Sequence, residues 1–141
     1  METSRSQKIT CIIGTKNSEA DIKDCLESAK FLDEIIVIDD FSTDQTVDIA
    51  RRYTDKVFQH KLTGYPEQMN YALQQAANRW VLVLDADEVI TAELQDEIRK
   101  KRTTPFAKNG YLLRRLNIFL GKEIKHCGWY EKNNLRFFDK E

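Results

Sequence analysis

The sequence predicts an α/β fold with a mostly parallel sheet, helices on both faces of that sheet and an irregular, β-rich part at the C-terminal end. Two observations predict this fold. Short apolar runs alternate with amphipathic stretches of helical period, and the connections between them are short. Two of the runs, 34–38 from Ile35 onward and 80–84, are apolar at successive positions, as in parallel strands that are covered on both sides.

Four strand–helix units are expected in order. The strands are expected at 8–14, 34–38, 56–59 and 80–84. The helices that follow them are expected to begin near Ser18, the polar stretch 41–44, Pro66 and Thr91, because small polar residues cap helices and proline suits their first turn. Two further strands are expected at 111–116 and 135–138, without helices between them.

The composition predicts a soluble globular protein, with 41% hydrophobic and 32% charged residues in 141. No apolar run approaches the roughly 20 residues of a membrane span. The polar start, residues 1–7, argues against a signal peptide. The three cysteines are odd in number and far apart, so they fit neither a disulfide framework nor a zinc site, and they favour a cytoplasmic location.

Charge divides the chain into two parts. Residues 1–98 carry 10 Lys and Arg against 19 Asp and Glu, while residues 99–141 carry 12 against 4. The basic part either meets an anionic partner or complements the acidic part within the fold, and the sequence leaves both open. Its interleaved aromatic residues suit phosphorylated glycolipids or the anionic inner face of a membrane. No nucleic-acid-binding motif is present, so nucleic acid is not expected as a partner.

Polar residues gather where the predicted strands end. Thr15 and Asn17 follow the first strand, Asp39 and Asp40 the second, and Asp85 and Asp87 the fourth. Ligands of open α/β sheets bind at the carboxyl ends of strands. In extended backbone, residues i and i+2 point to the same side, so the last two carboxylates are expected to share one cation. Oxygen-only ligands suit Mg²⁺ or Mn²⁺, which take their remaining ligands from water and a diphosphate.

Four segments carry a resemblance to a known family: residues 15–19, 33–46, 80–88 and, more loosely, 126–129. Together they resemble family-2 glycosyltransferases of the GT-A fold, and most closely the bacterial branch that adds sugars to the lipopolysaccharide core. The resemblance implies a nucleotide-sugar donor, with a UDP-sugar as the first choice, a glycan or lipid-linked acceptor, and a role in lipopolysaccharide or other cell-envelope polysaccharide synthesis.

The resemblance also implies roles for single residues. The nucleotide pocket would be lined by Thr15, Asn17 and Glu19. The base or ribose would meet Asp39 and Asp40. The metal would be held by Asp85 and Asp87, with Asp85 thereby contacting the donor. His126 would approach the diphosphate or the acceptor.

An inverting mechanism is implied as well, and it needs a general base that receives the proton of the acceptor hydroxyl. Glu131 is the best-placed carboxylate in the matching region, and Asp139 is the second choice. Residues 1–141 would then form one domain, with the donor-binding core at 1–102 and the start of an acceptor-side region at 103–141 that is truncated relative to longer relatives. The chain departs from many relatives at 68–70, Gln-Met-Asn, which lacks their Lys or Arg.

Two other functions fit parts of the pattern. One is a noncatalytic module that binds sugar nucleotides. The other is a phospho-receiver-like signalling domain, in which Asp39, Asp40 and Asp85 would share a magnesium ion. Against the receiver, a whole strand–helix unit precedes the acidic pair, and Asp87 has no role in that scheme. The oligomeric state stays open, with a dimer as one option.

Overall fold

The computed structural model describes residues 6–123 and 134–141. Its elements follow in the order β1 (Ile9–Thr15), α1 (Ile22–Ala29), β2 (Glu34–Asp39), α2 (Thr46–Arg51), β3 (Val57–Gln59), α3 (Tyr65–Gln75), β4 (Trp80–Asp85), α4 (Ala92–Lys101), β5 (Gly110–Leu113), β6 (Ile118–Phe119), β7 (Lys122–Glu123) and β8 (Asn134–Asp139). The α/β class and the four expected strand–helix units are confirmed.

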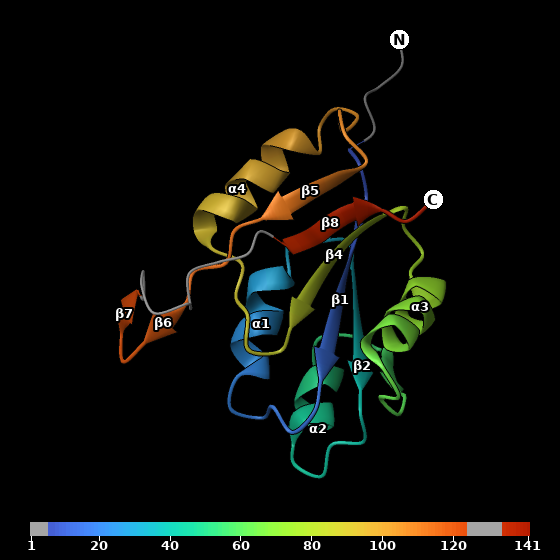
Figure 1. Cartoon of the computed structure of the whole chain (residues 1–141), viewed down its shortest axis with the longest axis vertical. Coiled ribbons are helices and arrows are strands. Elements are labelled where there is room, and N and C mark those ends of the chain that lie inside the picture. Colours follow the sequence, from blue (N-terminus) through green and yellow to red (C-terminus); the bar gives the residue numbers. More distant parts are fainter. Residues whose placement is uncertain (1–5, 124–133) are drawn as a thin grey trace.

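The main sheet has the strand order β3-β2-β1-β4-β8-β5 (Figure 1). The first four strands along the chain are parallel neighbours, whereas β8 lies between β4 and β5 and is antiparallel to both. The chain runs outward from β1 to β2 and β3, and then returns to place β4 on the other side of β1. The topological switch point therefore lies between β1 and β4, where open α/β sheets bind their ligands.

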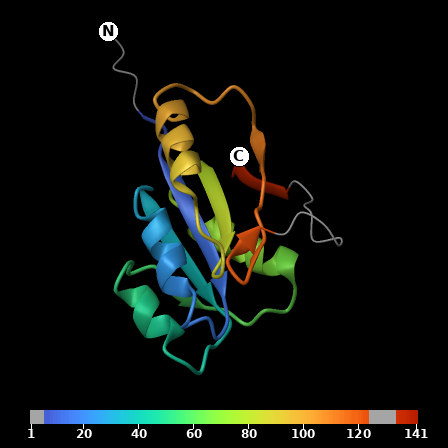
Figure 2. The same cartoon turned by 90° about the vertical axis from the view of Figure 1, so that its left-hand side faces the viewer.

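Helices cover both faces of this sheet. Figure 2 shows α1, α2 and α4 on one side of it and α3 on the other. Successive side chains of a strand point to opposite faces, so β1 serves two cores. Ile9, Cys11 and Ile13 pack with α1, α2 and α4, while Ile12 packs on the side of α3 with Ala72. Because helices cover both faces of the sheet, β1 is apolar and buried on both sides.

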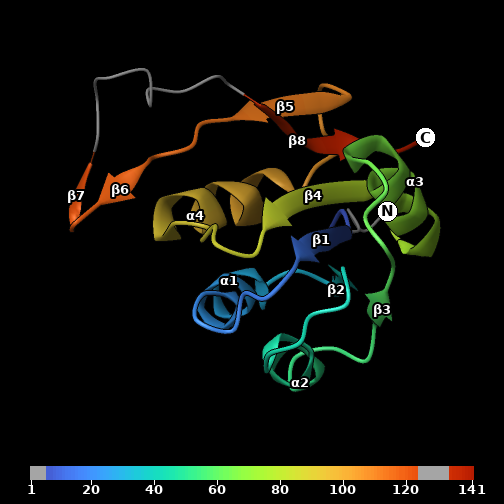
Figure 3. The same ribbon diagram turned by 60° about the horizontal axis from the view of Figure 1, so that its bottom comes forward.

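Aromatic rings join the C-terminal strands to the core. Trp80 at the start of β4 packs against Phe106 and Phe137, with ring centroids 4.3 and 5.1 Å apart, and Tyr111 of β5 stacks on Phe137 at 5.7 Å. The short hairpin of β6 and β7 extends away from the main sheet (Figure 3).

Some local expectations are wrong. Ser18 does not cap α1, which begins after Asp21; the Ser18 hydroxyl donates to the carbonyl of Lys16 instead. The strand expected at 111–116 ends at Leu113. Thr91 does cap α4, where its hydroxyl accepts the N–H of Leu94 at 3.3 Å. None of the helices in the described ranges is long and apolar enough to cross a membrane.

Candidate functional site

The carboxyl ends of three strands meet at one edge of the sheet. In the register of the sheet, Thr15 is opposite Asp39 of β2, and Gly14 is opposite Asp85 of β4. The arrowheads of β1, β2 and β4 point to the same end of the molecule in Figure 1. The expected gathering of polar strand-end residues at the switch point is therefore present.

Asp39 is a fully buried carboxylate that organises the loop after β2. It accepts the backbone N–H of Ser42 at 2.9 Å and the Ser42 hydroxyl at 2.5 Å, and the amide of Gln59 lies 3.4 Å away. Asp40 accepts the N–H of Leu62 at 3.1 Å and the ammonium of Lys16 at 3.2 Å. These partners, the Leu62 N–H foremost, hold the pKa of Asp40 below its ordinary value, so it is ionised at neutral pH.

Asn17 and Glu19 tie the loop after β1 to the loop after β2. The Asn17 side-chain oxygen accepts the N–H of Thr43 at 2.8 Å, and the carboxylate of Glu19 accepts the N–H of Gln45 at 3.0 Å. Asn17 has φ near +47°, a left-handed conformation that asparagine tolerates better than most residues. These contacts give both residues a structural task beside the nucleotide contact that the sequence predicts for them.

Two buried polar atoms near this edge lack a partner within the described structure. The hydroxyl of Thr15 is one, and Nδ1 of His60 is the other. His60 directly follows β3, donates its backbone N–H to the Asp39 carbonyl and stacks on Tyr71 with ring centroids 4.2 Å apart. A buried polar atom without a partner is uncommon in native proteins, so such atoms mark places where a ligand or water binds. Sequence reasoning missed His60, although its position after a predicted strand was a usable signal.

Met69, which stands where the family resemblance implies a Lys or Arg, packs against the core on the side of α3. Gln68, in the first turn of α3, lies beside Gly14, because a Cβ built on that glycine would be 3.5 Å from the Gln68 amide oxygen. A neutral amide therefore lies beside the end of β1.

Asp85 is the last residue of β4, and Asp87 lies in the turn that follows it. The N–H of Glu88 donates back to the Asp85 carbonyl at 3.0 Å. The expectation that strand geometry alone turns both carboxylates to one side is therefore wrong. Glu88, which the sequence analysis did not select, fixes the turn by accepting the N–H of Asp85 at 2.9 Å. The Asp85 side chain stays 50% exposed and Asp87 is exposed, so both are open to an ion from solvent.

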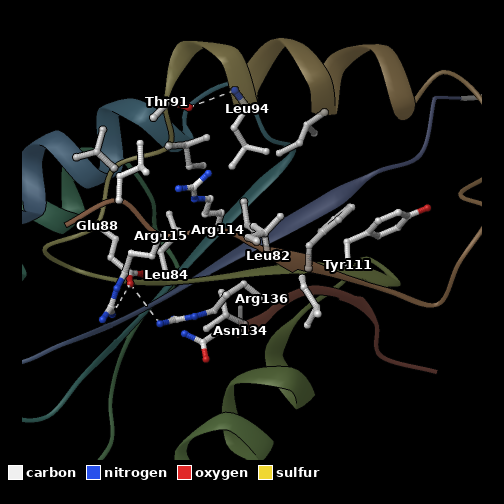
Figure 4. Close-up of a pocket in the computed structure, with 18 of the residues that line it drawn as sticks. Leu82, Leu84, Glu88, Thr91, Leu94, Tyr111, Arg114, Arg115, Asn134 and Arg136 are labelled. Atoms are coloured by element: carbon white, nitrogen blue, oxygen red, sulfur yellow. Dashed lines mark hydrogen bonds and ion pairs between the residues drawn. The ribbon is translucent and has the colours of Figure 1, made fainter. Parts of the chain in front are cut away.

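Two arginines from the C-terminal part meet this acidic turn. Arg136 of β8 places Nη2 3.2 Å from Glu88 Oε1 and 3.4 Å from Asp85 Oδ2, and Arg115 places Nη1 3.4 Å from Glu88 Oε1. Both side chains converge on Glu88 in Figure 4. They border a cavity of about 840 Å³ between β4, α4 and β5, whose walls are largely apolar and include Leu82, Leu84, Leu94, Tyr111 and Phe137.

The thiol of Cys25 reaches the same turn from α1. It donates to the carbonyl of Asp85 at 3.5 Å. Burial, together with the charges of Glu88, Asp87 and Asp85, raises the pKa of Cys25 to about 12. The thiol is therefore protonated at neutral pH and acts as a packing and donor group, not as a thiolate ligand.

The site does not include Asp139. It is opposite Trp80 at the start of β4, five residues from Asp85, which is roughly 17 Å along a strand. Its carboxylate is 5% exposed and pairs with Arg79 at 2.5 Å. The second choice for the general base therefore does not fit the structure, because the carboxylate lies at the wrong end of the sheet. Glu131, the first choice, and His126 lie outside the described residues.

The carboxylates fit a divalent ion only with help from a ligand. In the described ranges, no group of three or more His, Cys, Asp and Glu side chains is arranged to hold a metal. Asp85 and Asp87 offer oxygen ligands on an open turn, which suits Mg²⁺ or Mn²⁺ because these ions retain water and accept phosphate oxygens. The pair alone therefore supplies only part of the ligands that such an ion needs.

Comparison with known proteins agrees with this arrangement. The family model described as "Glycosyl transferase family 2" matches residues 10–107. The chain belongs to this family. An uncharacterized glycosyltransferase of Rickettsia typhi is 46% identical over 93 residues, which are 65% of this chain and 32% of that protein. The poly(ribitol-phosphate) β-N-acetylglucosaminyltransferase TarS of Staphylococcus aureus is 35% identical over 98 residues, 61% of this chain and 17% of TarS.

Solved structures of GT-A glycosyltransferases share the fold of this family member. The S. aureus TarS fragment 1–349 superposes with a TM-score of 0.58 at 34% identity, covering 67% of this chain and 32% of the fragment. A mannosyltransferase of Pyrobaculum calidifontis, solved with GDP-mannose and Mn²⁺, superposes with a TM-score of 0.61 at 23% identity, covering 77% and 36%. The chain spans about a third of the length of the Rickettsia relative and of both solved structures. Family membership argues against the receiver-like alternative.

Proposed function

We propose that the chain is the donor-binding part of a metal-dependent, inverting glycosyltransferase, which transfers a sugar from a nucleotide-diphosphate sugar to a glycan or lipid-linked acceptor. One observation carries the proposal. Thr15, Asp39 and Asp85 meet at the switch point of the sheet in a chain of glycosyl transferase family 2. Open α/β sheets bind their ligands there.

The nucleotide is assigned to the ends of β1 and β2. A ribose hydroxyl or a base carbonyl would give the buried Thr15 hydroxyl the partner that it lacks. Asp39 and Asp40 would face the ribose or the base from β2, while Asn17 and Glu19 hold the loop that carries them. Uridine is the first choice because TarS 1–349, solved in complex with UDP, is 31% identical with a TM-score of 0.53.

The divalent ion is assigned to Asp85 and Asp87. Bound there, Mg²⁺ or Mn²⁺ would neutralise charge that develops on the leaving nucleoside diphosphate. The protein's own part is to present two open carboxylates on a turn that Glu88 fixes. Because the Mn²⁺-containing neighbour is only 23% identical and supports the fold alone, this assignment depends on the carboxylates.

The acceptor is assigned to the basic, aromatic part of the chain. Direct attack by an acceptor hydroxyl needs a general base within hydrogen-bonding reach, and Glu131 remains the residue proposed for it. TarS acts on poly(ribitol-phosphate), as its name states, which supports a phosphate-bearing acceptor here too. We therefore propose lipopolysaccharide or another cell-envelope polysaccharide as the product class, made at the cytoplasmic face of the membrane.

A thermal-shift assay tests the donor site. The chain is heated with Mn²⁺ and a panel of nucleoside diphosphates, with Asp85→Ala and Asp87→Ala as site variants and Asp96→Ala, on the exposed face of α4, as the control. UDP with Mn²⁺ should stabilise the wild type and the control, by about 2.7 kcal/mol when the ligand is at 100 times its Kd. Equal stabilisation of Asp85→Ala would contradict the assignment.

A transfer assay then separates an enzyme from a binding module. Release of UDP from a UDP-sugar panel, with and without a phosphorylated glycolipid acceptor, reports turnover. UDP release that depends on Mn²⁺ and is lost in Glu131→Gln, with UDP binding retained, supports a metal-dependent transferase in which Glu131 is the general base. Binding without turnover in the 141-residue chain favours the module.

A further inference from the structure

Arg136 stands where its guanidinium meets two carboxylates of the proposed metal site. Its Nη2 is 3.4 Å from Asp85 Oδ2 and 3.2 Å from Glu88 Oε1. Both separations exceed the about 2.7–2.9 Å of a close charge-assisted hydrogen bond. The guanidinium is therefore shared between two carboxylates and held tightly by neither, an arrangement that a stronger cation can displace.

The other terminal nitrogen of Arg136 gives a second, independent observation. Nη1 is buried and has no hydrogen-bond partner within the described structure. A buried charged donor without an acceptor is costly. Arg136 lines the cavity between β4, α4 and β5 (Figure 4), so an anionic oxygen that enters beside Asp85 can supply the missing acceptor.

We propose that Arg136 is a positioning residue that couples metal binding to donor binding; this inference rests on the proposed function. Without a divalent ion, the guanidinium neutralises Asp85 and Glu88. With a divalent ion on Asp85, the guanidinium would be repelled at this short range. It would then be able to donate to diphosphate oxygens, whose geometry matches its planar array of N–H groups.

The consequence is a measurable coupling between two ligands. A divalent ion without nucleotide must displace the Arg136 guanidinium from Asp85, so it binds weakly. A nucleoside diphosphate gives the displaced guanidinium a new partner, so metal and nucleotide strengthen each other's binding by the same factor. Removal of the charge at position 136 should strengthen binding of the metal alone and weaken the coupling.

Isothermal titration of the 141-residue chain with MnCl₂, in the presence and absence of UDP, tests this proposal. Arg136→Gln and Arg136→Met remove the charge, Arg136→Lys keeps it, and Arg115→Gln is the matched control. Arg115 meets Glu88 at 3.4 Å with a side chain that is 51% exposed. We expect Arg136→Gln and Arg136→Met to bind Mn²⁺ alone about tenfold more tightly than wild type, and the enhancement by UDP to fall about fivefold. Arg136→Lys, which keeps the charge but not the planar N–H array, should bind Mn²⁺ alone about as weakly as wild type, and Arg115→Gln should change less than about threefold.

A gain in metal affinity is a result that local damage to β8 does not produce. Unchanged or weaker Mn²⁺ binding in both neutral variants, or wild-type enhancement by UDP in them, overturns the coupling. If the wild type binds Mn²⁺ and UDP and the neutral variants do not differ from it, only this inference fails. If wild type and variants all fail to bind Mn²⁺, the proposed function fails with it.

Discussion

The α/β core buries its apolar residues, whereas the hairpin of β6 and β7 exposes them. In β1 and β2, Ile13 and Ile36 are fully buried, whereas Ile118 of β6 is 71% exposed and Leu120 after it is 87% exposed. The loops after β1 and β2 are also tied to each other by hydrogen bonds. The proposed nucleotide site is therefore built from the core, and the C-terminal strands reach the neighbouring acidic turn through Arg136.

The largest contrast in the free energy of unfolding should appear between variants of Ile36 in the core and of Ile118 in the hairpin. Ile36→Ala opens a cavity between β2 and α3, so we expect a loss of about 2–5 kcal/mol in the free energy of unfolding. Ile118→Ala removes atoms that are already in water and should change it by less than about 0.5 kcal/mol. Urea denaturation followed by circular dichroism measures both. Similar losses would show that the hairpin is buried in solution and would break the comparison.

A smaller loss should follow removal of the buried carboxylate behind the nucleotide loop. Asp39→Ala leaves the N–H and the hydroxyl of Ser42 without their acceptor, so we expect a loss of about 1–3 kcal/mol. Asp48→Ala, on the exposed side of α2, is the control and should stay within about 0.5 kcal/mol. The same denaturation assay checks both variants. Equal values for the two would mean that the loop does not depend on this carboxylate.

The third prediction concerns pH and the far end of the sheet. Arg79, with the N–H of Glu141, holds the pKa of Asp139 below its ordinary value. The stabilisation by this carboxylate is complete above its unfolded pKa of about 3.9 and is lost as the pH falls through the lower native pKa. The difference in unfolding free energy between wild type and Asp139→Asn should therefore be constant above about pH 5 and shrink below about pH 4.

Asp139→Asn also tests whether Asp139 lies outside the proposed donor site. Because Asp139 lies at the start of β4, the variant should keep wild-type affinity for UDP and Mn²⁺ at pH 7. Titration calorimetry checks this point. A loss of nucleotide affinity without a change in fold would return Asp139 to the list of site residues.

The core could be predicted from the sequence because its signals are local. Runs such as 34–38 and 80–84 are apolar on both faces, and Thr91 caps the helix that follows it. The same runs point to Asp39 and Asp85, since the first polar residue after a buried strand lies at its carboxyl end. Thr15, Asn17 and Asp87 follow from strand-end positions as well, and the family resemblance adds Glu19 and His126 to the expected site.

Nonlocal contacts were beyond such reasoning. Ser18 is not a cap because its hydroxyl donates to the carbonyl of Lys16, while its N–H is bonded to the hydroxyl of Thr46, 28 residues away. The insertion of β8 between β4 and β5 depends on pairings that no local pattern encodes. The contacts of Arg136 are nonlocal too. The sequence shows a charged residue inside an apolar strand, but its partners, Asp85 and Glu88, lie about 50 residues earlier in the chain.

The most direct test of the central assignment is titration of UDP into the chain with Mn²⁺ and with EDTA, for wild type and Asp85→Ala. We expect wild-type binding of UDP to depend on Mn²⁺, and Asp85→Ala, with an unchanged circular dichroism spectrum, to lose at least tenfold in UDP affinity. Equal UDP affinity in the two proteins, or wild-type affinity that is the same in EDTA, would contradict the claim that this turn holds a metal and the metal holds the donor.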